Sequence, residues 1–192
     1  MHLVDHSASS SNTSPFGLCN ALLISISMML LGFTAQMVDS EELTPESLRA
    51  YLQAQRSYRE GSPVIITFGL DGPPDLDLRV LTWHTPLEGM FAPMFRIVWR
   101  GHGVIPYQGA LAKRGDPSES EYVLLPASGH IGAEIDLTKG YDLTGLGTYD
   151  VDLETKLFDV VAPGEPWPRQ RSRFHSVQLI ADHLVIRIVP RH

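Results

Sequence analysis

Three aspartates, Asp142, Asp150 and Asp152, lie close together in the stretch YDLTGLGTYDVDL (141–153). Carboxylates gathered in this way bind calcium in some proteins and supply acid and base for glycoside hydrolysis in others. Their spacing does not match the calcium loop of an EF-hand, so an adventitious calcium site between loops is the only calcium alternative. The strands and loops that carry them decide whether they do chemistry or only face solvent.

Strand periodicity favours solvent exposure for the last two aspartates. On a β-strand, Asp150 and Asp152 share one face. Tyr149, Val151 and Leu153 then share the other face. The glycines just before them permit the positive φ angles of a tight corner, and a tyrosine that opens such a strand can donate its hydroxyl to the corner. We predict a strand with carboxylates outward and apolar residues inward, beginning at a tyrosine corner.

The histidines do not form the zinc motif of a metalloprotease. In that motif, HExxH, two histidines lie four residues apart and a glutamate follows the first. Only His2 and His6 have this spacing, and their stretch, HLVDH, lacks the glutamate. An enzyme would need three of the other histidines to converge on a metal, which their spacing does not predict. These are spread over expected loops and strand ends: His84, His102, His130, His175, His183 and His192.

Other catalytic signatures are missing from the sequence as well. It contains no Gly-x-Ser-x-Gly elbow, no glycine-rich phosphate loop followed by lysine, and no Cys-x-x-Cys pair. The single cysteine, Cys19, precedes a hydrophobic segment and would be lost if that segment were cleaved. We therefore expect a protein that is not an enzyme, with no catalytic residue, no metal and no cofactor.

The chain that must position these residues has an apolar pattern with a period of two from residue 64 onward. Segments rich in β-branched and aromatic residues recur with turn residues between them, which is typical of an antiparallel sandwich or barrel. Three prolines make 162–171 a loop. We predict an all-β, immunoglobulin-like antiparallel β-sandwich spanning residues 62–192. The expected strand segments are 64–70, 76–83, 94–100, 121–126, 130–137, 147–154 and 174–189.

A short N-terminal helix is predicted within a helix-and-linker region at 36–61. Thr44 is a candidate N-cap, Pro45 suits the first helical turn, and Glu46 suits the positive end of the helix dipole. Apolar and amphipathic side chains then follow helical spacing up to a break at 60–63. These are Leu48, Tyr51, Leu52 and Tyr58.

The amino terminus has the character of an export signal. Residues 21–35, ALLISISMMLLGFTA, carry no charge and have the length of a signal-peptide core, short for a membrane span. No Lys or Arg precedes them, so an uncleaved membrane anchor is the alternative. We expect residues 1–35 to be a signal peptide or hydrophobic N-terminal segment, and the protein to be secreted or periplasmic, with membrane contact only through this segment.

Length, composition and net charge limit which classes of protein this chain can belong to. The chain has 192 residues, 43% of them hydrophobic, which suits one globular domain. Its formal net charge of -7 and the absence of a basic stripe argue against nucleic-acid binding.

Residues 62–156 carry landmarks that together resemble the N-terminal, non-catalytic region of aspzincin metalloendopeptidases, of the deuterolysin and peptidyl-lysine type. In that family this region is an immunoglobulin-type β-sandwich that precedes the protease domain, and the resemblance implies the same fold here. The landmarks are Thr85-Pro86-Leu87-Glu88-Gly89, Tyr107-Gln108-Gly109, Lys113-Arg114, Tyr141-Asp142-Leu143 and Gly147-Thr148-Tyr149.

The sequence matches only one of the family's two catalytic motifs. Its protease domain carries HExxH and a later Gly-Thr-x-Asp whose aspartate binds zinc. The stretch GTYD (147–150) has the second pattern, but it lies in an expected sandwich strand and the sequence has no HExxH. The resemblance therefore implies a fold and a relationship to proteases, without the activity.

These observations lead to one main hypothesis about function. The chain is an exported, prodomain-like binding module whose partner is an aspzincin-type metalloendopeptidase, which it inhibits or helps to fold. Loops 84–93 and 108–119 are the expected contact loops, although their apolar residues would alternatively cap the core and their cations face solvent. The candidate partner-binding residues are Met90, Phe91, Met94, Lys113, Arg114 and Trp167.

The alternative is a structural or adhesive envelope or extracellular module that binds another protein or a carbohydrate. A carbohydrate site would place Trp83, Trp99 and Trp167 in a row on one exposed sheet face.

Overall fold

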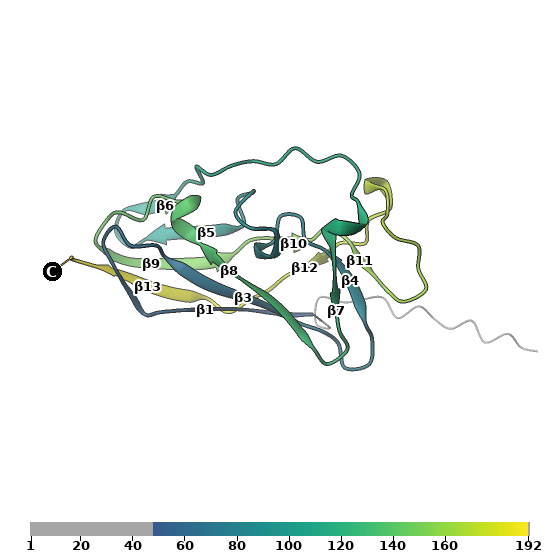
Figure 1. Cartoon of the computed structure of the whole chain (residues 1–192). Coiled ribbons are helices and arrows are strands. Elements are labelled where there is room, and N and C mark those ends of the chain that lie inside the picture. The colour runs from purple at the N-terminus through teal and green to yellow at the C-terminus, as the bar shows by residue number, and fades with distance from the viewer. Residues whose placement is uncertain (1–47, 192) are drawn as a thin grey trace, which may run out of the picture. The chain divides into compact units, whose positions relative to one another are not determined.

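A computed structural model describes residues 48–191, which fold as β-strands joined by loops and short 3-10 helices (Figure 1). The strands are β1 (Arg49–Ala54), β2 (Ser57–Arg59), β3 (Ile65–Asp71), β4 (Leu78–Leu81), β5 (Phe95–Trp99), β6 (Gly103–Ile105), β7 (Tyr122–Leu125), β8 (His130–Asp136), β9 (Gly147–Leu153), β10 (Lys156–Leu157), β11 (Val160–Val161), β12 (Val177–Gln178) and β13 (Leu184–Val189). The 3-10 helices are η2 (Pro86–Glu88), η3 (Glu119–Glu121), η4 (Leu137–Lys139) and η5 (Arg171–Arg173).

The strands form one large sheet and three smaller ones. The five-stranded sheet has the order β2-β13-β9-β5-β6 and is antiparallel except for the β2–β13 pair. Two three-stranded sheets have the orders β1-β3-β8 and β11-β4-β7, and β10 pairs with β12 alone. Apart from the β5–β6 hairpin, the pairings join strands that are not neighbours in close succession along the sequence.

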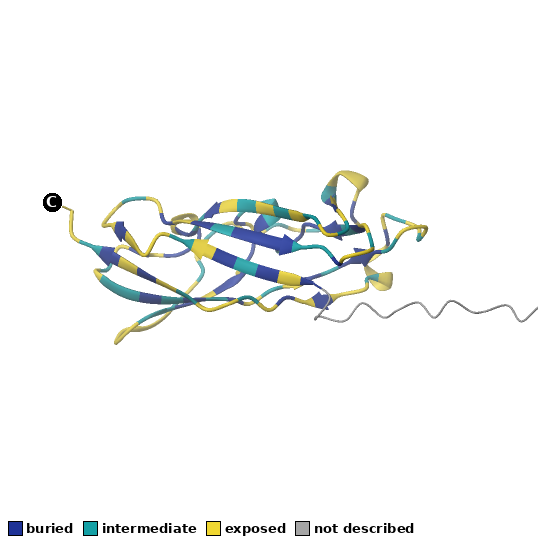
Figure 2. Ribbon diagram, turned by 90° about the horizontal axis from the view of Figure 1, so that it is seen from below, coloured by how far each residue is buried: buried dark blue, intermediate teal, exposed yellow. Residues whose placement is uncertain are grey.

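One apolar core joins the five-stranded sheet to the β1-β3-β8 sheet. Ile66 and Phe68 from β3 share a single buried cluster with Ile97, Tyr149 and Ile186 from the other sheet. Buried and exposed residues alternate along the strands, as blue and yellow bands in Figure 2 show. The predicted all-β class is confirmed, with a sandwich-like arrangement of the two sheets.

The predicted N-terminal helix is wrong over the residues that the structure describes, because β1 and β2 occupy this stretch. Leu48 and Leu52 suit one face of a helix, but with Ala50 they also alternate with polar residues, and all three are buried. Pairing of β1 with β3 and of β2 with β13 satisfies backbone groups and buries this face, so tertiary contacts override the helical pattern.

β1 and β2 thus belong to the same sheets as the strands that follow residue 62. The helix cap predicted at 44–46 and the hydrophobic segment at 21–35 lie outside the described residues. No helix among residues 48–191 is long and apolar enough to cross a membrane.

The predicted tyrosine corner is confirmed at the start of β9. The Tyr149 hydroxyl donates to the Gly145 carbonyl at 2.7 Å, and the ring is completely buried. The Trp99 ring packs so closely on Gly145 that a Cβ there would lie 2.3 Å from it. Residue 145 must therefore be glycine for this corner to close under the tryptophan.

We expect Tyr149→Phe to lower the free energy of unfolding by about 1 kcal/mol, since the Gly145 carbonyl loses its donor while the ring still fills the core. Urea denaturation measures the change. Tyr51→Phe is the matched control, because the Tyr51 hydroxyl makes no hydrogen bond within residues 48–191, and its effect should be smaller. Equal effects from the two variants would mean that the corner bond does not stabilise the fold.

Candidate binding groove

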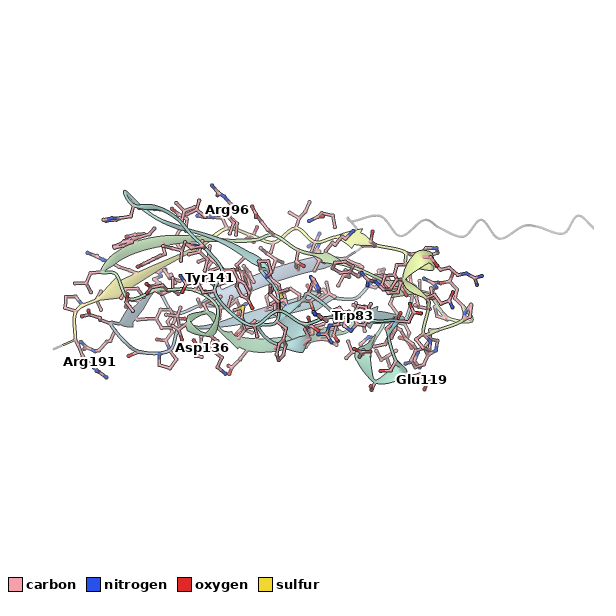
Figure 3. All side chains as sticks on the ribbon, turned by 90° about the horizontal axis from the view of Figure 1, so that it is seen from above. Trp83, Arg96, Glu119, Asp136, Tyr141 and Arg191 are labelled. Atoms are coloured by element: carbon pink, nitrogen blue, oxygen red, sulfur yellow. The ribbon has the colours of Figure 1, made fainter. Side chains whose placement is uncertain are left out.

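Two adjoining pockets form a groove where the loop after β4 meets the segment that follows β9. The first, which we call the Trp83 pocket, has a volume of ≈ 360 Å³. It is lined by Trp83, His84, Arg114, Lys156, Phe158, Arg171, Phe174 and Ser176. Figure 3 places Trp83 and Glu119 toward the same end of the described residues, away from Arg191.

The second pocket, the Pro93 pocket, has a volume of ≈ 390 Å³ and continues the first. The two pockets share His84, Lys156 and Phe158, which form the wall between them. The other residues that line it are Pro93, Leu153, Glu154, Thr155 and Gln178.

Aromatic rings form the floor of the groove. The Trp83 ring meets Phe174 edge to face with centroids 6.2 Å apart, and its side chain belongs to a second small core beneath the pocket. The His84 and Phe158 rings lie 4.9 Å apart at the shared wall. Trp83 is almost fully buried, whereas Phe158 and His84 are half-buried and face the groove.

Arg114 holds the loop 106–118 against this floor. Its guanidinium pairs with Glu88 and with Glu121, and it lies 5.3 Å from the centre of the Trp83 ring. Glu121 also accepts the Trp83 indole N–H at 2.7 Å. Burial raises the pKa of Glu121, but hydrogen bonds from Ser118 and Trp83 outweigh it and leave that pKa below its ordinary value. The charge of Arg114 is therefore largely compensated inside the protein.

Two other cations at the groove have no such compensation. The Lys156 ammonium lies 5.1 Å from the centre of the Phe158 ring, and one Arg171 amino group donates to the Arg114 carbonyl at 3.2 Å. Neither side chain forms an ion pair with any group of residues 48–191. Both are exposed, so their charges face whatever enters the groove.

The predicted partner-binding residues do not lie together on one surface of the structure. Met90 and Met94 are buried in the main core, as the alternative for the apolar residues stated. Phe91 is 44% exposed and Lys113 is exposed, so these two are free to meet a partner. Arg114 lines the groove but is held by Glu88 and Glu121.

Trp167, the last of these residues, lies apart from the groove. It is half-buried, between the Arg79 guanidinium at 3.9 Å from its ring centre and the Tyr122 ring at 5.8 Å. Its exposed area is thus small, and its ring supports the β11-β4-β7 sheet.

Sequence reasoning missed most of the groove. Lys156, Phe158, Arg171 and Phe174 belong to segments that read only as a strand end and a loop, and no motif marks them. Phe158 and Phe174 come together because a buried ion pair folds the intervening segment back. The concentration of Arg and aromatic residues in 167–174 is the one sequence signal that could have pointed to it.

That ion pair joins Arg169 to Asp159 at 2.9 Å, with the carboxylate completely buried. Asp159 also accepts the Tyr122 hydroxyl at 2.8 Å and the His175 backbone N–H at 2.8 Å, while Glu165 pairs with Arg169 from the other side. Burial, aided by the bond to Asp159, raises the pKa of Tyr122 well above its ordinary value. These contacts fix the loop that carries Arg171 and Phe174.

The aspartates of β9 take part in a different arrangement on the outer face of the five-stranded sheet. We call Arg96, Arg100, Asp150, Asp152 and His183 the outer charged cluster. Arg100 pairs with Asp150 at 2.6 Å and Arg96 with Asp152 at 3.5 Å. His183 bridges the two carboxylates, with Nδ1 2.7 Å from Asp152 and Nε2 2.9 Å from Asp150.

The carboxylates are thus outward, as predicted, and matched by cations. The hydrogen bond from Arg100, followed by that from His183, lowers the pKa of Asp150 to about 2 despite partial desolvation. Asp142 instead accepts the Thr144 backbone N–H and hydroxyl, which closes a local turn. Among residues 48–191, no group of three His, Cys, Asp or Glu side chains is placed to hold a metal ion.

We expect Asp159→Asn to lower the free energy of unfolding by about 3 kcal/mol, because it leaves the Arg169 charge buried with only the half-exposed Glu165 as partner. Urea denaturation again measures the change. Glu165→Gln removes the outer partner and should cost less than about 1 kcal/mol. If both variants cost the same, the buried pair does not anchor the loop.

The stability of the fold should depend on pH through His183. Hydrogen bonds to Asp152 and Asp150 raise the pKa of His183 above its unfolded value, so its protonated form stabilises the fold below about pH 6.5. This contribution is lost as the pH rises through the folded-state pKa. Wild type should therefore exceed His183→Gln in stability by more at about pH 5.5 than at about pH 8.5.

Denaturation of both proteins at the two pH values measures this difference. In an Asp152→Asn background, which removes the stronger of the two hydrogen bonds, the pH dependence should shrink. A gap between wild type and His183→Gln that is the same at both pH values would contradict the bridge.

Comparison with known proteins gives one sequence relative. No protein-family model matches the chain. An extracellular protease of Aeromonas hydrophila is 32% identical over 104 residues, which are 53% of this chain and 30% of the protease. Among solved structures, a cohesin module of a Clostridium perfringens family 33 glycoside hydrolase covers 76% of this chain and 98% of the module with 12% identity, and its TM-score of 0.29 carries no argument. About half of the chain is therefore similar in sequence to part of an extracellular protease.

Proposed function

We propose that this chain is an exported, non-catalytic, immunoglobulin-like β-sandwich module that binds an aspzincin-type metalloendopeptidase and inhibits it or assists its folding. The observation that carries the proposal is the 32% identity to part of an extracellular protease. The chain spans about a third of that protease, and its own sequence contains no HExxH. A protease-related module without that motif is suited to act on a protease rather than as one.

The groove supplies a surface for such binding. It combines aromatic rings with exposed cations, a composition that suits hot spots of protein interfaces, where aromatic residues and arginine are enriched. The expected contact loops, 84–93 and 108–119, contribute His84, Pro93 and Arg114 to its lining. Phe91 and Lys113 extend the same loops into solvent.

The tryptophans favour this proposal over a carbohydrate-binding one. Trp83 is 3% exposed, and Trp99 is stacked between His102 and Tyr149, with centroids 3.7 Å and 5.7 Å away. Trp167 packs on Arg79 of the β11-β4-β7 sheet, whereas Trp99 belongs to the five-stranded sheet. The three rings therefore do not form the exposed row on one sheet face that a carbohydrate site of this kind requires.

The test is a binding and activity measurement with two probes, the Aeromonas hydrophila extracellular protease and the secreted proteases of the organism that makes this chain. We expect the immobilised native chain to retain a metalloprotease, and the free chain to slow its cleavage of casein or raise its yield on refolding. The same chain unfolded in urea and left immobilised without refolding is the control. If the native chain retains no protease and changes neither rate nor yield, the proposal fails.

A further inference from the structure

The charged side chains that line the Trp83 pocket are all positive. Its lining contains Arg114, Lys156 and Arg171 and no carboxylate. Glu88 and Glu121 pair with Arg114, whereas the side chains of Lys156 and Arg171 form no ion pair within residues 48–191, although Asp116 accepts the Arg171 backbone N–H at 3.2 Å. The pocket therefore offers two free positive charges above a floor of Trp83 and Phe174.

We propose that the groove binds an extended peptide segment that carries an acidic side chain in the Trp83 pocket and a large apolar side chain in the Pro93 pocket. The carboxylate lies between Lys156 and Arg171, and its methylene groups pack on Phe158 and Phe174. This inference rests on the proposed function, in that the segment belongs to the protease partner.

The geometry of the two pockets indicates a chain rather than a small anion. They share one wall, so a ligand that fills both must cross Phe158 and Lys156. In an extended peptide, residues i and i+2 project to the same side, about 7 Å apart, which places them on the two sides of such a wall. We therefore assign the acidic and apolar residues of the ligand to positions i and i+2.

The backbone around the groove can meet an extended chain as well. Thr155 and Lys156 line the Pro93 pocket, and β10, which begins at Lys156, pairs with β12 and with no other strand of residues 48–191. An open strand edge has N–H and C=O groups available for the backbone of an added peptide. The carboxylate then gives specificity through charge-assisted hydrogen bonds to Lys156 and Arg171.

The apolar side chain is assigned to the Pro93 pocket from its lining. The lining of this pocket is mostly polar, with Pro93, Leu153 and Phe158 as its apolar part, and Glu154 disfavours a second carboxylate there. Two free cations are also too few for nucleic acid, whose binding needs a longer array of phosphate contacts. An acidic residue followed two positions later by an apolar one is the ligand that matches both pockets.

The probe is the blocked pentapeptide acetyl-Ala-Glu-Ala-Phe-Ala-amide, titrated into the isotope-labelled full chain and followed by NMR. We expect saturable shifts confined to backbone amides of the groove residues. Replacing Glu by Gln should weaken binding about fivefold, the upper end of the effect of one partly exposed ion pair. Moving Phe next to Glu, in acetyl-Ala-Glu-Phe-Ala-Ala-amide, should weaken binding similarly because only one pocket is then filled.

Variants of the chain test the assigned cations. The double variant Lys156→Gln/Arg171→Gln should bind the Glu peptide at least about fivefold more weakly and should no longer distinguish it from the Gln peptide. Lys139→Gln, which removes an exposed cation of η4 outside the groove, is the matched control and should leave the affinity within about twofold. Equal binding of the Glu and Gln peptides, shifts centred elsewhere, or equal competition by inorganic phosphate would overturn the inference.

The same double variant separates this inference from the proposed function. If it retains the protease as well as wild type does, the groove is not the contact surface and the inference fails while the proposed function stands. If wild type binds the peptide through the groove but retains no protease, the proposed function fails and the peptide specificity stands.

Discussion

The alternation of buried and partly buried side chains along β9 is the constraint on which the rest of the structure depends. β9 lies at the centre of the five-stranded sheet, so Tyr149, Val151 and Leu153 point into the core shared with the facing sheet. The same alternation sends Asp150 and Asp152 outward, where Arg96, Arg100 and His183 meet them. The strand begins at the corner closed by Tyr149 and ends at Leu153, which lines the Pro93 pocket. A slip of one residue in the register of β9 would exchange the two faces and disrupt all of these features together.

How much of this could be predicted from the sequence depends on the range of each interaction. The alternation in β9 and the corner at Tyr149 are local, and local pattern and turn chemistry predicted them. The segment around Leu48 and Leu52 was mispredicted, because its apolar spacing fits both helix and strand and the choice was made by pairing with β3. Of the groove, only His84, Pro93 and Arg114 belong to the predicted contact loops. Phe158 and Phe174 also line the Trp83 pocket, in segments joined by the buried ion pair of Asp159 and Arg169, and the sequence spacing of those two residues does not predict that they pair.

Buried charge has a structural role at this end of the molecule. Removing Asp159 and Arg169 from water is costly, and the cost is offset because the carboxylate also accepts bonds from Tyr122 and from the His175 backbone. Tyr122 begins β7, whereas Asp159, Arg169 and His175 belong to the segments between strands beside the β11-β4-β7 sheet. The network therefore gives the loop 162–175 one arrangement, and with it a fixed position for Phe174 and Arg171 at the groove. A site that recognises a ligand benefits from such preorganisation, since less conformational entropy is lost on binding.

Ion pairing distinguishes the two charged surfaces of the protein. In the outer charged cluster, each carboxylate has an arginine partner and shares His183, so its polar groups are satisfied without a ligand. At the groove, Arg114 also pairs with two carboxylates, although its Nε has no hydrogen-bond partner within residues 48–191, whereas the side chains of Lys156 and Arg171 form no ion pair within that range. Both cations border aromatic rings, which lowers the polarity around a bound carboxylate and strengthens its attraction to them. The outer cluster is thus paired within the described residues, while the Lys156 and Arg171 side chains, which form no ion pair within residues 48–191, would gain the same compensation from an acidic ligand.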